Sequence, residues 1–114
     1  MNFNEYQQLS MRTMPKPEYG VKYGKDAKAN YAMGLSGEAG EVTDLIKKEL
    51  FHGHESEPEK VLKEIGDVLH YASGLATMYG FTLEEAAEMN IEKLKKRFPN
   101  GFNTEDSIKR VDTK

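Results

Sequence analysis

The sequence predicts an all-α domain, a bundle of four to five helices. Apolar residues recur at helical spacing along most of the chain, and no segment alternates apolar and polar residues as a half-buried strand would. The connections between the apolar segments are short, which favours helices that neighbour one another in space. With 114 residues and no internal repeat or low-complexity tract, the chain is expected to fold as a single domain.

The N-terminal half predicts two helices separated by a loop that contains proline and glycine. The first helix covers residues 4–14 and is broken by Pro15 and Pro17, because proline lacks the amide hydrogen and disfavours helix in the preceding residue. Asp26 is the predicted N-cap of a long second helix, which ends near Phe51. Each helix carries one apolar stripe that should face the core.

The C-terminal half predicts two further helices, each opened by a capping box. Ser56 with Glu59 begins a third helix over residues 57–79, and Thr82 with Glu85 begins a fourth that stops before the next proline. The remaining tail is polar, with at most one short helical turn. The single domain therefore divides into an N-terminal helix and loop, a helical core and a polar tail: residues 1–25, 26–98 and 99–114.

Composition excludes several classes of function. Sixteen basic and nineteen acidic residues give a net charge of −3, which excludes a general nucleic-acid binder that works by bulk positive charge. No apolar run approaches the eighteen or so residues of a membrane span, and no signal-peptide pattern opens the chain. The absence of cysteine excludes disulfides, thiol catalysis and cysteine-ligated metals. A soluble cytoplasmic protein is expected, with chemistry carried by carboxylates, basic groups, histidines or hydroxyls.

Two pairs of acidic residues are the most informative feature of the sequence. Glu38 and Glu41 lie in the second helix, Glu64 and Asp67 in the third, and each i,i+3 pair projects from one side of its helix at the edge of the apolar stripe. An antiparallel hairpin centred near residue 53 sets the two pairs level with each other. Four converging carboxylates repel unless cations lie between them, and Mg²⁺ or Mn²⁺ suits oxygen ligands of this kind.

A simpler interpretation is that these acids lie on solvated helix faces and form ion pairs within their helices. That interpretation is weakened because none of the four has a basic residue at i+4, the favourable position. Those four positions hold Val42, Leu45, Val68 and Tyr71. Residue spacing alone leaves the two interpretations open.

A basic face on the fourth helix accompanies the acids. Asn90, Lys93 and Arg97 lie at i, i+3 and i+7, and folding the fourth helix back along the third would place Arg97 level with the acidic pairs. Metal on one side of a polyphosphate and basic side chains on the other would neutralise it. The alternative is that these cations complement the C-terminal helix dipole, and this is the preferred interpretation for Lys95 and Lys96.

Three blocks of sequence, taken in order, resemble the MazG-like all-α nucleoside triphosphate pyrophosphohydrolases. The paired ExxE and ExxD motifs are the signature of that superfamily, and the third block matches its substrate-side motif. Each motif alone is weak, but together they span the chain from Tyr31 to Phe102. The blocks are Gly37–Val42, Glu64–Leu69 and Asn90–Pro99.

The resemblance implies a function and an assembly. It implies Mg²⁺-dependent hydrolysis of a (deoxy)nucleoside triphosphate to the monophosphate and pyrophosphate, in nucleotide-pool house-cleaning, with Mn²⁺ as a substitute metal. It also implies a homodimer or homotetramer in which a neighbouring chain completes the core and the substrate pocket. No nucleic-acid or membrane partner is expected.

The resemblance also assigns roles to residues. The implied metal ligands are Glu38, Glu41, Glu64 and Asp67; the implied substrate-binding residues are Asn90, Lys93 and Arg97; and the implied catalytic residues are Glu41, Lys93 and Arg97. Two alternatives remain. One is a phosphoribosyl-ATP pyrophosphohydrolase on the same scaffold, and the other is a non-catalytic, metal-binding helical module for oligomerisation or regulation.

Overall fold

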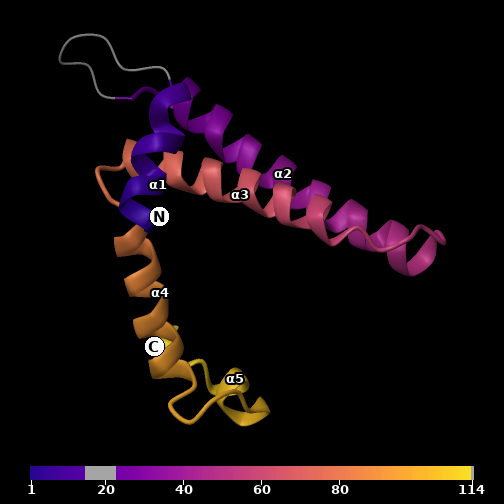
Figure 1. The fold of residues 1–114 in the computed structure, drawn as a ribbon. Helices are drawn as coiled ribbons and strands as arrows, with labels where there is room; N and C mark the ends of the chain where they lie inside the picture. The colour runs from indigo at the N-terminus through magenta and orange to yellow at the C-terminus, as the bar shows by residue number, and fades with distance from the viewer. Residues whose placement is uncertain (15–22, 114) are drawn as a thin grey trace.

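A long antiparallel hairpin of two helices dominates the structure, a computed structural model that describes residues 1–14 and 23–113 (Figure 1). Its arms are α2, Lys25–Phe51, and α3, Pro58–Met78. The turn between them contains Gly53 with φ +73°, a left-handed conformation that glycine adopts without strain. The predicted hairpin is therefore present, and its bounds lie close to those expected from the sequence.

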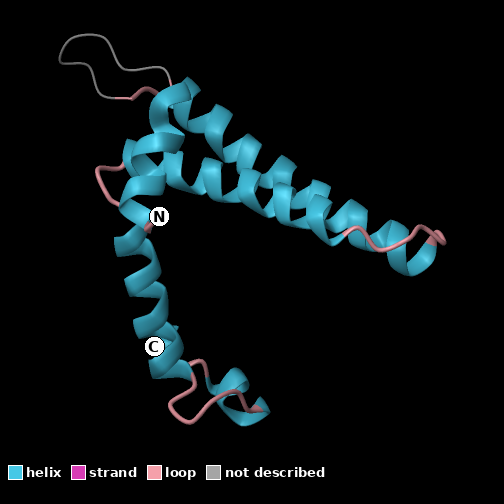
Figure 2. Ribbon diagram, in the orientation of Figure 1, coloured by secondary structure: helices cyan, strands magenta, loops and turns pink. Residues whose placement is uncertain are grey.

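The other helices lie at the open end of this hairpin and beyond it (Figure 2). They are α1 (Phe3–Ser10) with the 3₁₀ turn η1 (Met11–Thr13), α4 (Leu83–Arg97), α5 (Thr104–Lys109) and the 3₁₀ turn η2 (Val111–Thr113). No strand occurs among the described residues, so the prediction of an all-α fold is confirmed. No helix in this part of the chain is both long enough and apolar enough to cross a membrane. The predicted break at Pro15 and Pro17 lies outside the described residues.

The helix caps agree with the sequence in one case and differ in two. The capping box of Thr82 and Glu85 is formed, with the Thr82 hydroxyl accepting from the Glu85 amide at 3.0 Å. At α2 the predicted cap is wrong, because Gly24 is the N-cap and Asp26 lies inside the first turn. There the negative charge of Asp26 interacts favourably with the positive end of the helix dipole.

The capping box predicted at Ser56 is also wrong. Glu57 is the N-cap of α3 and makes no side-chain capping bond, and Pro58 is the first helical residue. Proline has no amide hydrogen and its φ already suits a helix, so it can start α3 with fewer unpaired donors and without a hydroxyl cap.

Two tyrosines packed against glycines bring α2 and α3 together. The ring of Tyr71 on α3 covers Gly34 on α2, and the ring of Tyr31 on α2 covers Gly74 on α3, so that a Cβ at either glycine would collide with the facing ring. The two tyrosines meet edge to face, with ring centroids 5.2 Å apart. The helix glycines, which are unfavourable for helix formation, are therefore used at these two positions for close packing.

We expect Gly74→Ala to destabilise the protein by about 1–3 kcal/mol, because the new methyl group must displace the buried Tyr31. Gly37→Ala is the matched control, since it makes the same change in a helix where nothing lies within 4 Å. There the gain in helix propensity, about 1 kcal/mol at most, should leave stability equal or higher. Urea unfolding of both variants measures the difference, and equal stabilities would contradict this description of the packing.

The fourth helix does not fold back along the third, which is a correction to the sequence analysis. It leaves the end of α3 at a wide angle and points away from the hairpin (Figure 1). The side chain of Gln7 on α1 fixes this corner. It donates to the Thr77 hydroxyl at 2.8 Å and to the Phe81 carbonyl at 3.1 Å, and it accepts from the Leu83 amide at 2.7 Å.

This arrangement leaves one chain extended and poorly buried. The radius of gyration is 17.3 Å, against about 13 Å for a compact domain of this length. Several apolar residues predicted to face inward are exposed instead, because no other part of residues 1–14 and 23–113 covers them. Examples on α2, α3 and α4 are Ile46, Leu50, Ile65, Ile91 and Leu94.

Candidate active site

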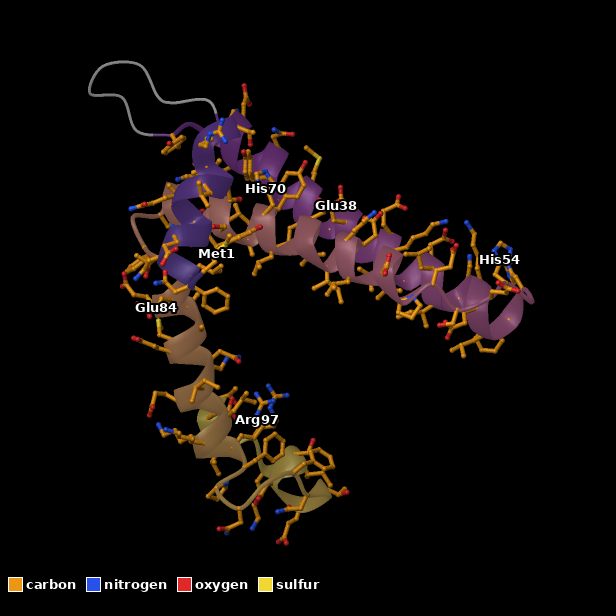
Figure 3. All side chains as sticks on the ribbon, viewed as in Figure 1. Met1, Glu38, His54, His70, Glu84 and Arg97 are labelled. Carbon is orange, nitrogen blue, oxygen red and sulfur yellow. The ribbon has the colours of Figure 1, made fainter. Side chains whose placement is uncertain are left out.

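Three of the four predicted acids form a cluster between the arms of the hairpin. Carboxylate oxygens of Glu38, Glu64 and Asp67, hereafter the carboxylate cluster, all lie within 4.8 Å of one another. Glu38 comes from α2 and the other two from α3, as the hairpin register requires. The first two are half-buried and Asp67 is exposed, so the cluster lies at the edge of the helix–helix interface (Figure 3).

The cluster is electrostatically strained by its own charges. A proton shared with Glu38 raises the pKa of Glu64 above its usual value, and partial burial and the negative charges of Glu38 and Asp67 raise it further. The raised pKa means that this carboxylate ionises reluctantly. A cation between the carboxylates would remove the repulsion, so the chemistry of the donor set fits a divalent metal ion.

Distances in the cluster also suit a small hard cation. Mg²⁺ binds oxygens at about 2.0–2.1 Å, so two ligands on opposite sides of one ion are about 4.2 Å apart. The separations within the cluster therefore need only a small side-chain movement to reach ligand distance. The arrangement can hold a divalent ion with open positions for water and phosphate oxygens.

Glu41 lies outside the carboxylate cluster. It is exposed on α2, one turn beyond Glu38. The hydrogen bond and charge of Asp44 raise the pKa of Lys48, and the negative charge of Glu41 adds a smaller effect in the same direction. The structure thus brings together three of the predicted ligands and leaves the fourth beside them with its carboxylate exposed.

A cavity of about 730 Å³ opens beside Asp67, between α1 and α3. Its lining includes Lys63, His70 and Ser10, and the last two are joined by a hydrogen bond of 2.6 Å between Oγ and Nδ1. Cavities of this size accommodate nucleotide-sized ligands. That α1 lines this space could not be predicted, because its packing against α3 depends on contacts between residues sixty positions apart in the sequence.

The basic face of α4 is formed, but far from the carboxylate cluster in the same chain. Asn90 and Lys93 are exposed and Arg97 lies near the end of the helix, well separated from Glu38 (Figure 3). The expectation that folding back would set Arg97 level with the acids within one chain is therefore wrong. The Gln7 contacts at the corner direct α4 away from the hairpin.

Arg97 is paired with an acid that the sequence analysis did not single out. Its Nε and Nη2 donate to the two carboxylate oxygens of Asp112, each at 2.6 Å. The hydrogen bonds from Arg97 lower the pKa of Asp112 to about 2. Because η2 is anchored on this pair, Arg97 contributes to the fold as well as to the basic face. One acid in a polar tail carried no signal in the sequence.

Comparisons with known proteins agree with the motifs. The model of the MazG nucleotide pyrophosphohydrolase domain matches residues 27–102, well over half of the chain. The chain is also 29% identical over 105 residues to Gene 37 protein of Mycobacterium phage L5, covering 89% of this chain and 92% of that protein. No solved structure matches it. The matched segment contains all four predicted acids and the basic face of α4.

Proposed function

Because the chain belongs to the MazG nucleotide pyrophosphohydrolase family, we propose that it hydrolyses a (deoxy)nucleoside triphosphate to the monophosphate and pyrophosphate. The observation that carries the proposal is the carboxylate cluster, in which acids from both motifs meet across the hairpin. We propose Mg²⁺ as its cofactor and the removal of unwanted nucleotides from the pool as its role.

The proposed roles combine the resemblance to the family with the positions of the acids in the hairpin. The carboxylate cluster and Glu41 would hold the metal, which when bound would polarise a phosphate and lower the pKa of a water molecule. Glu41, whose carboxylate is exposed beside the cluster, also accepts the proton of the attacking water. The cavity beside Asp67 takes the nucleoside, and Asn90, Lys93 and Arg97 contact the sugar and phosphates.

A second copy of the chain is needed to bring that basic face to the carboxylate cluster, and we propose a homodimer or a pair of dimers. One chain exposes 8856 Å², whereas a folded monomer of 12.9 kDa exposes about 6,300 Å². The excess is about 2,500 Å² per chain, so two chains that cover it in a dimer would bury about 5,000 Å² in total, at the upper end of the range for obligate homodimers. Exposed apolar side chains on both the hairpin and α4 supply the surface for this contact.

Light scattering tests the assembly. The expected result is a particle of twice or four times 12.9 kDa at micromolar concentration. A Leu62→Glu substitution should shift the equilibrium toward monomer, because Leu62 is 68% exposed in one chain and a charge there would be buried in a dimer that uses this face. A parent protein that stays at 12.9 kDa would contradict the proposed dimer.

The activity is tested by incubating the protein with a panel of canonical and modified nucleoside triphosphates, with Mg²⁺ or with a chelator. The expected products are the monophosphate and pyrophosphate, formed only with the metal. Phosphoribosyl-ATP belongs in the panel, since its selective cleavage would favour the other enzyme considered for this scaffold. Metal binding without turnover of any substrate would favour a non-catalytic module.

A further inference from the structure

The Arg97–Asp112 pair is the shortest and least exposed salt bridge in the described residues. Arg97 is also one of the residues proposed to bind the substrate. The Asp112 side chain is completely covered, whereas that of Arg97 retains 22% of its exposure. Other salt bridges in this part of the chain join side chains that are each 39% or more exposed. The pair therefore presents a guanidinium at the surface with a carboxylate behind it.

The pairing with Asp112 leaves some of the N–H donors of Arg97 free. A guanidinium has five N–H donors in a fixed plane, and Asp112 occupies the one on Nε and one on Nη2. Three donors remain for an anion on the partly exposed side. A carboxylate that holds two donors of the fork also fixes the plane and direction of the others.

A surface cavity also places Asp112 beside the other basic residues of α4. Its volume is about 520 Å³, α4 supplies one wall and the C-terminal turn η2 another, and its lining residues are Glu92, Lys93, Lys95, Lys96 and Asp112. Arg110, in the left-handed conformation with φ +50°, ends α5 and turns the chain toward this wall. The C-terminal turn is thus part of the basic face rather than a separate tail.

We propose that Asp112 is a positioning residue, which holds the guanidinium of Arg97 so that its free N–H donors and Lys93 meet the same phosphate group of the substrate. The proposal rests on the proposed function, since it adds a residue to that site. A phosphate can engage the three free donors without breaking the pair, and the covered carboxylate need not be exposed.

If Asp112 instead competed with the phosphate for Arg97, its substitution would change kcat/KM in the opposite direction. If the carboxylate occupied the donors that the substrate needs, Asp112→Asn would raise kcat/KM. As a positioning residue, Asp112 predicts a loss, because asparagine presents an NH₂ group to the guanidinium and frees it to reorient. Misplacing a phosphate-binding group by about 1 Å can cost about 100-fold, so we expect kcat/KM to fall by roughly 10- to 100-fold.

Further variants test whether Asp112 acts through its carboxylate and through Arg97. Asp112→Glu retains the carboxylate and should recover part of the activity. Glu105→Gln, in the same C-terminal segment, removes the same charge from an exposed residue and is the matched control, expected to match the parent. Asp112→Asn in an Arg97→Ala background should have no further effect. If Asp112 acted independently of Arg97, the substitution would cost as much there as in the parent.

Binding of inorganic pyrophosphate with Mg²⁺, measured by calorimetry, separates this proposal from the proposed function. A parent protein that hydrolyses no triphosphate overturns the function. In that case, weaker pyrophosphate binding by Asp112→Asn, with no change for Glu105→Gln, still supports the positioning role. A rise in kcat/KM, unchanged activity and binding in Asp112→Asn, or no pyrophosphate binding by the parent overturns it.

Discussion

Glu64→Gln is expected to abolish triphosphate hydrolysis and the stabilisation by Mg²⁺, while it makes the metal-free protein more stable. The carboxylate of Glu64 lies between Glu38 and Asp67, and glutamine keeps its size without its charge. Loss of a hydrogen-bond partner around a metal ligand typically costs 10- to 100-fold. Loss of a ligand itself should therefore lower kcat by at least about 100-fold.

The gain in stability without metal follows from the raised pKa of Glu64. Its folded-state pKa lies above the unfolded value, so the folded protein binds a proton more tightly. Metal-free stability should therefore increase as pH falls through the folded pKa and decrease again as pH rises through it. In Glu64→Gln this pH dependence disappears, because the titrating group is gone. The variant should be the more stable protein at neutral pH in a chelator.

Thermal melts with chelator and with Mg²⁺, together with assays of pyrophosphate release, measure all three effects. Glu88→Gln is the control, because it removes the same charge from an exposed position in the middle of α4, away from both helix ends. If a lower negative charge stabilised the protein in general, both variants would melt at a higher temperature. If the stabilisation comes from reduced repulsion within the carboxylate cluster, only Glu64→Gln will do so. Parent-level hydrolysis by Glu64→Gln would exclude this residue as a metal ligand.

The hairpin and its acids could be predicted from the sequence because both depend on local information. The 3.6-residue period fixes which side of a helix each acid occupies, and a short turn sets the register of the two arms. Glu38 therefore meets Glu64 and Asp67 as expected. Periodicity gives an angular position but no side-chain conformation, so it did not separate Glu41 from the other three.

The direction of α4 and the role of Asp112 could not be predicted, because both depend on distant contacts. Gln7 fixes the corner through partners that are seventy or more residues away, and no pattern along the chain links them. Arg97 finds its carboxylate fifteen residues later in a polar tail that lacks periodicity. The sequence predicts that the apolar stripes face a core, but within the described part of one chain several of their residues remain uncovered.

Lys93→Ala should lower kcat by roughly 10²–10³ and leave folding and metal affinity nearly unchanged. A cation that contacts a phosphate whose charge increases in the transition state acts mainly on kcat, and loss of one such donor typically has this magnitude. Lys93 is exposed and takes part in no salt bridge within the described residues, so stability should change by about 0.5 kcal/mol at most. Arg97→Ala does not separate phosphate binding from folding, because it also breaks the pair with Asp112.

The matched control for Lys93→Ala is Lys109→Ala, which removes the same charge from the last turn of another helix, α5. Lys109 is exposed, pairs with Glu105 at 3.1 Å and is not among the residues that line the cavity beside Lys93. Its loss should leave kcat within about twofold of the parent, since exposed pairs of this kind contribute little. Pyrophosphate release, circular dichroism and Mn²⁺ titration on both variants distinguish a phosphate contact from a cation that only complements the helix terminus.

Mixing two inactive variants shows which chain supplies Lys93 to a given site. The end of α4 lies far from the carboxylate cluster of its own chain, so we expect Lys93 to serve the cluster of the partner (Figure 3). Glu64→Gln and Lys93→Ala chains that are co-expressed at equal levels should then pair at random, and half of the dimers are mixed. In each mixed dimer one site combines an intact Glu64 with an intact Lys93, which restores about a quarter of the parent activity. If Lys93 served its own chain, every site would carry one defect and no activity would return.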